Sequence, residues 1–245
     1  MENKFSFHNH SVFSNDKFLK NETPYMILKQ IRIDKIRFTA ITDARSDTFF
    51  DYIVKNRREY TRLCEIEPIN KAIIRLIFDN WEGFLLRGME KHDYNGHLLI
   101  IGTEKRIIYK RSYSINDWIN FTHDYGGICG AAHPILRFVG GMGEKMMMKY
   151  IDKLDFIESF NAQLVFYKKA NFRAEKISKR YNSPGIATSD SHNHKNLAKS
   201  YFYTNESVDP DIGAIKTLIK QKKFKNVKRY ISYADLIRTY ILGRL

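Results

Sequence analysis

The chain contains only two cysteines among its 245 residues, Cys64 and Cys129, and neither belongs to a CxxC pair. This scarcity excludes a disulfide-stapled fold and a zinc site built from cysteine ligands. Long apolar runs are also missing, because no stretch approaches the ~20 residues that a membrane-spanning helix requires. Strand-like residues follow Met1 almost directly, so we expect no signal peptide and a cytoplasmic protein without a membrane partner.

Linkers, repeats and low-complexity segments are absent as well. No region combines many Pro, Gly and Ser residues, which is the composition typical of a boundary between domains. A chain of 245 residues is long enough to bury a substantial core in one piece. We therefore expect residues 1–245 to form a single domain.

Acidic residues are few relative to basic ones. The chain has 27 Asp and Glu against 41 Lys and Arg, a formal net charge of +14. An excess of this size attracts polyanions and steers phosphate-bearing ligands. Solvated lysines would give the same excess, because the charge is spread along the chain and is densest only over residues 216–229. A nucleotide or nucleic-acid ligand and a merely solvated surface both remain open interpretations.

Short apolar runs alternate with helical patterns throughout the sequence. We expect strands at residues 5–10, 36–42, 64–69, 84–90, 97–102, 128–132, 156–160, 185–188 and 199–204. We expect helices at residues 24–33, 47–63, 70–80, 114–125, 145–150, 164–180, 210–220 and 233–242. The alternation predicts an α/β fold with parallel strands and crossover helices, and the number of units favours a barrel over an open sheet.

Two histidines, His8 and His10, stand two positions apart at the end of the first apolar run. In a β-strand, the side chains at positions i and i+2 point to the same face, so these imidazoles would project together. Two neutral imidazoles side by side can bind a transition metal. Taken alone, the pair is also compatible with a strand end that carries two solvated histidines.

Further histidines and carboxylates, with one asparagine, recur where other strands begin or end. These residues are Asp43, Glu90, His97, His133, Glu158, Asn161, Asp190 and His192. The carboxyl ends of the strands of a parallel barrel form one face, and active sites lie there. Buried ionisable residues are rare unless they are paired or bind a metal. The set as a whole therefore predicts one metal-binding face, although each residue by itself could be a satisfied loop residue.

Taken in order, these motifs resemble those of the PHP (polymerase and histidinol phosphatase) family of metal-dependent phosphoesterases. The matching motifs are His8-Asn9-His10 with Ser14, Ile41-Thr42-Asp43, Gly88-Met89-Glu90, His97-Leu98-Leu99, Gly126-Gly127 to Ala132-His133-Pro134, Glu158 to Asn161, and Ser189-Asp190-Ser191-His192. They span residues 5–204 and leave residues 210–245 as C-terminal helices. The resemblance implies a distorted (β/α)7 TIM-like barrel, two or three Zn, Mn or Fe ions, and hydrolysis of phosphate esters.

The resemblance also implies the ligands of each metal. The ligands of the first metal would be His8, His10, Glu90 and Asp190. Those of the second would be Glu90, as a bridge, with His97 and His133. A third metal would use His192 and Asp16, but the family histidine that follows Thr-Asp is missing because Ala44 stands there. This departure weakens the third site.

The implied chemistry is hydrolysis by metal-activated water, because two metals about 3.5–4 Å apart bind phosphate oxygens, generate hydroxide near neutral pH and stabilise the leaving oxygen. We expect the catalytic carboxylates to be Glu90 and Asp190, with Asp43 orienting a histidine. Mixed imidazole and carboxylate ligands suit Zn, Mn or Fe. Arg45 and Arg137 are candidate clamps for a phosphate, although both could be ordinary surface arginines.

The sequence is compatible with more than one class of substrate. The net charge and the basic segment favour a nucleotide or a nucleic acid, and a small-molecule phosphatase of histidinol-phosphate type is the alternative. A degenerate module that binds metal or nucleic acid without turnover is the third interpretation, which Ala44 motivates. Three further histidines, His92, His123 and His194, fall outside the motifs, and His194 is a spare candidate ligand because it lies close to His192.

Overall fold

The computed structural model describes residues 2–14 and 19–240. Asp16, the expected loop ligand, lies outside these residues, as do the last two positions of the helix expected at residues 233–242. No described helix is both long enough and apolar enough to cross a membrane.

The strands form two sheets. The larger sheet contains β1 (Asn3–Ser6), β2 (Phe38–Ala40), β3 (Glu65–Pro68), β4 (Ile73–Phe78), β5 (Trp81–Leu86), β11 (Tyr201–Thr204) and β12 (Lys225–Val227). Its order is β12-β11-β1-β2-β5-β4-β3. The smaller sheet contains β6 (Gly88–Lys91), β7 (Leu98–Ile101), β8 (Ile128–Ala131), β9 (Phe156–Asn161) and β10 (Gly185–Thr188). Its order is β10-β9-β8-β7-β6.

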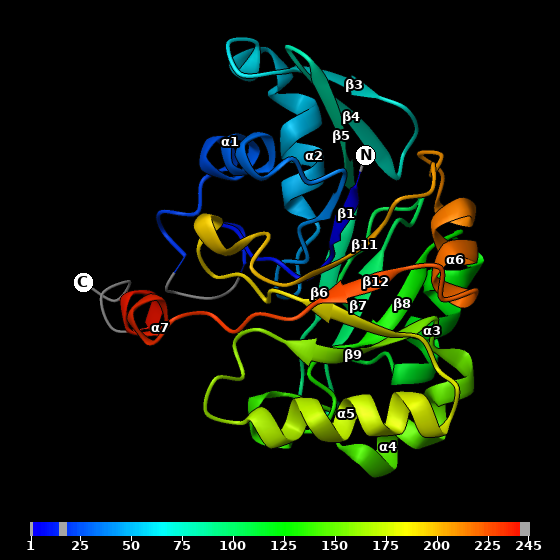
Figure 1. The fold of residues 1–245 in the computed structure, drawn as a ribbon. Coiled ribbons are helices and arrows are strands. Elements are labelled where there is room, and N and C mark those ends of the chain that lie inside the picture. Colours follow the sequence, from blue (N-terminus) through cyan, green and yellow to red (C-terminus); the bar gives the residue numbers. More distant parts are fainter. Residues whose placement is uncertain (1, 15–18, 241–245) are drawn as a thin grey trace.

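Helices surround the strands (Figure 1). The α-helices are α1 (Pro24–Asp34), α2 (Thr48–Lys55), α3 (Ile115–Asp124), α4 (Glu144–Tyr150), α5 (Lys168–Arg180), α6 (Ile212–Lys220) and α7 (Tyr233–Tyr240). Short 3-10 turns occur at Arg57–Tyr60, Arg137–Val139, Ile151–Lys153 and His194–Asn196. The expected helix starts are confirmed: Thr23 caps α1 with Pro24 in its first turn, and Ser114 forms a capping box with Asp117 at α3.

The sheets are mixed rather than parallel throughout. Strand β1 pairs in parallel with β2, β2 with β5, β8 with β9 and β9 with β10. The other neighbours are antiparallel, and β4 and β5 show why, since only Asp79 and Asn80 connect them. A connection of two residues permits only an antiparallel hairpin. The helix expected at residues 70–80 is therefore wrong, because the β-branched run at its centre forms β4.

The architecture is a mixed α/β fold, and the described strands do not close into the continuous barrel that we expected. Arg87 alone separates β5 from β6, where the chain passes from one sheet to the other. Isolated parallel bridges join the sheets again beyond the strand ends. One bridge pairs Asn9, after β1, with Ser191, after β10, and the other pairs Ala44, after β2, with Glu90 in β6. These bridges draw the loops that carry the expected ligands toward one another.

One apolar core lies between the two sheets. The Phe5 ring stacks on Phe38 and on Phe202, with ring centroids 4.7 Å apart in each pair. Phe156 and Leu99 of the smaller sheet belong to the same cluster, which α6 covers. His8 and His10 follow the end of β1, Asn161 ends β9, and Asp190 follows β10. The histidines and carboxylates therefore gather at the ends of the strands away from α6, on the side where α7 lies (Figure 1).

Candidate metal centre

His8 and His10 lie beyond the end of β1, which stops at Ser6, rather than within the strand that we expected. Their imidazoles still converge, with ring centroids 5.1 Å apart. The Nε2 atoms of both rings lie 3.3 Å from Oδ1 of Asp190. Asp190 itself follows β10 with a φ of 50°, a left-handed conformation that turns the chain directly after the strand. The loops after β1 and β10 thus meet at one carboxylate.

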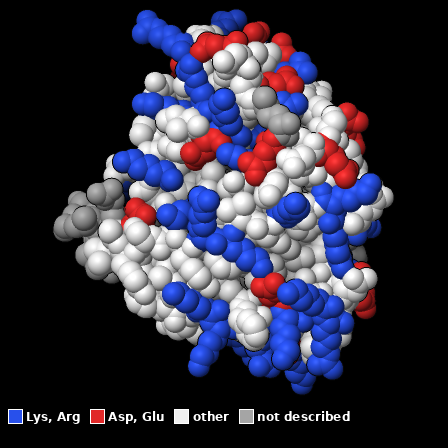
Figure 2. Space-filling model, in the orientation of Figure 1, with Lys and Arg blue, Asp and Glu red and all other residues white. Residues whose placement is uncertain are grey.

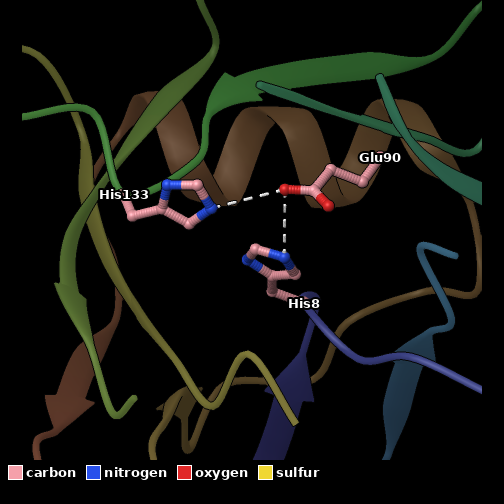
Figure 3. Close-up of side chains that lie close together, drawn as sticks. All are labelled: His8, Glu90 and His133. Carbon is pink, nitrogen blue, oxygen red and sulfur yellow. Dashed lines mark ion pairs between the residues drawn. The ribbon is translucent and has the colours of Figure 1, made fainter. Parts of the chain in front are cut away.

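Glu90 lies at the centre of the cluster and is 2% exposed. Its Oε1 atom lies 2.9 Å from Nδ1 of His97, 3.4 Å from Nε2 of His133 and 3.5 Å from Nε2 of His8. Figure 3 shows how His8 and His133 approach this oxygen from different sides. One carboxylate oxygen therefore faces three imidazoles that come from separate parts of the chain.

A buried carboxylate, Glu158, holds two of these residues in place. Its Oε1 lies 2.5 Å from Nδ1 of His8, and its Oε2 accepts a hydrogen bond of 2.5 Å from the backbone N–H of His133. The hydroxyl of Thr188 also donates to Oε1, at 2.5 Å. Because Nδ1 of His8 carries the proton of its bond to Glu158, Nε2 is directed toward Glu90 and Asp190. Glu158 therefore fixes the orientation of the His8 ring and, when His8 is neutral, its tautomer.

Asn161 links this support to Asp190. The side-chain amide of Asn161 donates 3.0 Å hydrogen bonds both to Oε2 of Glu158 and to Oδ2 of Asp190. The amide of Gln163 donates to the backbone carbonyl of Asp190 at 2.9 Å. These bonds leave Oδ1 of Asp190 facing the two histidines.

The cluster keeps its carboxylates ionised. Burial alone would raise the pKa of Glu90 and Asp190, but the surrounding histidines hold both pKa values well below the usual range. Burial likewise opposes the charged form of His8, yet Asp190 and Glu158 raise the pKa of His8 well above 6.5. Burial, with help from the neighbouring His192, lowers the pKa of His10. At neutral pH the centre thus offers ionised oxygen donors and at least one neutral imidazole.

These donors fit a divalent transition metal. Imidazole nitrogens and carboxylate oxygens together are the ligands that Zn, Mn and Fe accept. Nε2 of His8 is buried and makes no hydrogen bond among the described residues, an arrangement that costs free energy unless a further group satisfies it. Three groups of candidate ligands have atoms close enough to share an ion: His8 with Glu90 and His133, His8 with His10 and Asp190, and Glu90 with His92 and His97. The groups share His8 and Glu90, so they are contiguous.

The motifs did not point to His92, which the structure adds to the cluster. Its Nδ1 atom lies 3.5 Å from Oε2 of Glu90, and its ring centroid is 3.9 Å from that of His97. The side chain is 41% exposed, whereas His8 and His10 are almost fully buried. A signal was present in the sequence: His92 stands two positions after Glu90, the same spacing as in the first pair.

The remaining expected site residues lie at or near the centre. The ring of His192 lies beside that of His10, with ring centroids 4.5 Å apart and the ring planes tilted by 41°. Asp43 accepts hydrogen bonds of 2.5 Å from the N–H and the hydroxyl of Ser11, the residue after His10. His194, the spare candidate, is instead bound to a buried glutamate, Glu22, through a 3.0 Å contact of Nδ1.

The two candidate phosphate clamps stand at the edge of the centre. The guanidinium of Arg45 donates from Nε to the backbone carbonyl of His92 at 2.6 Å and lies over the ring of Tyr109. Arg137 is exposed at the start of a 3-10 turn. A cavity lies above the candidate ligands, and neither arginine is among the described residues that line it. Their role as clamps stays a prediction.

A fourth group of possible ligands, His123 with Cys129 and Asp155, lies elsewhere. Oδ2 of Asp155 lies 2.8 Å from Nε2 of His123 and accepts from the N–H of Cys129 at 2.9 Å. Its Oδ1 atom pairs with Nζ of Lys216 at 3.1 Å. The ammonium group already balances the carboxylate, so this group is a structural network that ties α6 to the smaller sheet.

Comparison with known proteins identifies the fold. No family model and no curated protein sequence matches the chain. A solved two-domain protein from Bacteroides vulgatus, containing a predicted PHP-like metal-dependent phosphoesterase, matches with a TM-score of 0.65 and 16% identity, over 99% of this chain and 70% of that chain. The lesion-specific endonuclease PfuEndoQ from Pyrococcus furiosus matches with a TM-score of 0.61 and 16% identity, over 92% of this chain and 58% of that chain.

A third solved structure, PsfC from Pseudomonas syringae, matches with a TM-score of 0.63 and 12% identity, over 99% of this chain and 96% of that chain. Identities this low establish the fold rather than the activity. The chain therefore has the fold of the PHP-like metal-dependent phosphoesterases, as its motifs predicted.

Proposed function

We propose that the protein is a metal-dependent phosphoesterase that hydrolyses phosphate esters. The observation that carries this proposal is the convergence of buried imidazoles and ionised carboxylates around Glu90, with neighbouring donor atoms 3.3–3.5 Å apart. Ligand atoms bound to one Zn-sized ion lie about 3–3.5 Å apart, because each is about 2.0–2.2 Å from the ion. The fold that the chain shares with PHP-like phosphoesterases supports the same function.

The ligand assignment follows the contiguous groups. His8, His10 and Asp190 would hold one ion. Glu90 would bridge to a second ion, whose other ligands would be His133, His97 and His92. A third ion would involve His192, but Ala44 supplies no ligand where the family pattern has a histidine. Two divalent ions, of Zn, Mn or Fe, are therefore the expected complement.

Different residues of the chain would have different roles in the reaction. Glu158 and Asn161 keep the lone pairs of His8 and Asp190 directed at the centre, which preorganises the site before substrate binds. Bound divalent ions supply Lewis-acid stabilisation of phosphate oxygens and lower the pKa of water. Arg45, whose guanidinium lies next to His92, would contribute positive charge toward a substrate phosphate.

Nucleic acid is the second candidate substrate, and two observations favour it. The chain carries a net charge of +14. Two solved structures with the same fold are the endonuclease PfuEndoQ and an Endonuclease Q in complex with a DNA duplex that has an abasic lesion at the active site. A module that binds metal without turnover remains the non-catalytic alternative, because Ala44 replaces a histidine ligand of the family pattern.

The test combines metal analysis with mutagenesis. Purified protein should contain about two equivalents of Zn, Mn or Fe per chain, and a panel of phosphate esters and oligonucleotides with added Mn should reveal hydrolysis. The double substitution His8→Ala with His10→Ala should lower the metal content from about two equivalents to about one or fewer, and the activity by at least about a hundredfold, because it removes ligands from the first group.

A matched control is His123→Ala, which removes a partly exposed histidine outside the centre. It should leave metal content and hydrolysis near the wild-type level. Hydrolysis that survives the double substitution would exclude this centre as the catalyst. Stoichiometric metal without hydrolysis of any ester would instead favour the non-catalytic module.

A further inference from the structure

A cavity of about 620 Å³ opens above the candidate ligands. Its floor includes His10, Glu90 and Asp190, whereas most of its wall is apolar. The apolar rim is formed by Val139, Phe166, Tyr167, Tyr233, Leu236 and Ile237. Volumes of about 300–1,000 Å³ are typical of sites for small molecules. The cavity is thus large enough for an organic group attached to a phosphate at the ligands.

The apolar rim comes from three separate parts of the chain: the turn after His133, the loop after β9, and α7. Phe166 is 67% exposed, Tyr233 is 55% exposed and Ile237 is 51% exposed. The rings of Phe166 and Tyr233 lie 5.3 Å apart, so the loop and α7 meet across the cavity edge. Large exposed apolar groups that gather on one edge typically mark a binding surface. Flat aromatic faces favour flat apolar ligands.

The described wall of the cavity does not favour a second strongly anionic group. No lysine or arginine side chain lines the cavity among the residues that the structure describes. The densest basic segment, residues 216–229, begins in α6, which covers the core at the opposite end of the strands from α7 (Figure 1), and none of its side chains lines the cavity. The wall itself therefore offers a polyanion no lysine or arginine counter-charge.

We propose that this cavity binds small phosphate esters whose alcohol carries a flat apolar group, and that the apolar rim holds that group while the phosphate lies at the candidate ligands. The proposal rests on the proposed phosphoesterase function and names its substrate class. In the reaction, the oxygen of water bonds to phosphorus, the bond from phosphorus to the alcohol oxygen breaks, and the alcohol leaves with one proton of the water. The rim would orient the alcohol and select it by its apolar area.

Two non-hydrolysable probes test the substrate class without relying on turnover: 2-naphthylmethylphosphonate and methylphosphonate, added to the full-length chain loaded with Mn. Calorimetry should show that the naphthyl probe binds at least about tenfold more tightly, because it removes apolar surface from water. Phe166→Ala and Ile237→Ala should each reduce that advantage by about two- to tenfold. Phe172→Ala is the matched control, since Phe172 is 70% exposed on α5 and lies outside the cavity.

The outcomes separate this proposal from the proposed function. Equal affinity for both probes, or binding of neither, would overturn the apolar subsite even if the protein hydrolyses simple phosphate esters. A naphthyl preference that Phe166→Ala reduces and Phe172→Ala preserves would support the subsite, even if no ester were hydrolysed and the phosphoesterase function failed. A preference that neither Phe166→Ala nor Ile237→Ala reduces would place the aromatic group elsewhere and would overturn the proposal as well.

Discussion

Single residues at the centre are fixed by a small number of buried hydrogen bonds. Glu158 matched the motif only as one of several polar residues near a strand end, yet it contacts both His8 and the backbone of His133. Asp43, which we expected to orient a histidine, holds the N–H and hydroxyl of Ser11. In both cases the residue was found from sequence, whereas its partner was not, because the partner depends on which loops meet.

Asp43 provides a test by pH. Burial raises the pKa of Asp43 to about 7, although Ser11 opposes the shift. The native state then binds more protons than the unfolded state above pH 4, so ionisation of Asp43 lowers the free energy of unfolding as the pH rises toward 7. Asp43→Asn keeps an acceptor for the N–H and a donor for the hydroxyl of Ser11. The variant should therefore gain stability over wild type between pH 4 and 8, by up to about 4 kcal/mol.

Urea unfolding of both proteins in the presence of a chelator measures this difference at each pH. A difference that stays constant over the range would mean that Asp43 does not titrate there. A comparison within the pair isolates Asp43, because every other titrating group is common to both proteins.

At the scale of elements, the hairpin of β6 and β7 supplies more of the centre than any other segment. Alternation along β6 points Glu90 toward the centre, while the next side chain, Lys91, is buried on the other side. Nζ of Lys91 contacts Oδ1 of Asp93 at 2.5 Å and the carbonyl of Gly96 at 2.8 Å. These contacts close the turn between the strands from the inside and so position His97, the residue just before β7.

The loop after the turn Arg137–Val139 holds that histidine from the other side. The backbone N–H of His97 donates to the carbonyl of Gly140 at 2.8 Å. A Cβ atom at Gly140 would overlap the imidazole of His97, and the residue has a φ of 89°. Gly140→Ala should therefore displace His97 and lower Mn affinity by about tenfold or more, as measured by metal titration.

Gly126→Ala is the matched control for this change. Gly126 has a similarly positive φ of 75°, but a Cβ there would meet nothing within 4 Å. Both substitutions introduce about the same backbone strain, because each places a Cβ atom at a residue with positive φ. Equal metal affinity in the two variants would show that contact with His97 does not matter.

At the scale of the whole molecule, the net charge of +14 is dispersed. Figure 2 shows Lys and Arg side chains spread over much of the viewed face, with Asp and Glu among them. Within the basic segment, Nζ of Lys228 pairs with Glu175 at 2.8 Å, and Lys216 pairs with Asp155. Part of the segment is thus neutralised locally, which favours the interpretation of solvated or paired lysines over that of a polyanion groove.

Salt dependence tests this interpretation. For a small ester, kcat/KM should change by less than about threefold between 50 and 200 mM NaCl, because few counterions are released. A nucleic acid that makes six or more phosphate contacts would lose about a thousandfold in affinity over the same range. The measurement is steady-state kinetics at constant Mn with an ester and with an oligonucleotide. A steep fall in kcat/KM for the oligonucleotide as the salt concentration rises would instead favour nucleic acid as the substrate.

The sequence by itself determined which residue types bear the chemistry and most positions of strands and helices, because periodicity, caps and short motifs act over a few residues. It therefore predicted the candidate ligands and the fold family, but not the role of His92. Only the tertiary structure decided how the strands pair, because pairing joins residues far apart in the chain. Two hairpin-rich sheets therefore replaced the expected continuous barrel, and the cavity with its apolar rim arose where α7 and two loops meet, a contact that no local pattern encodes.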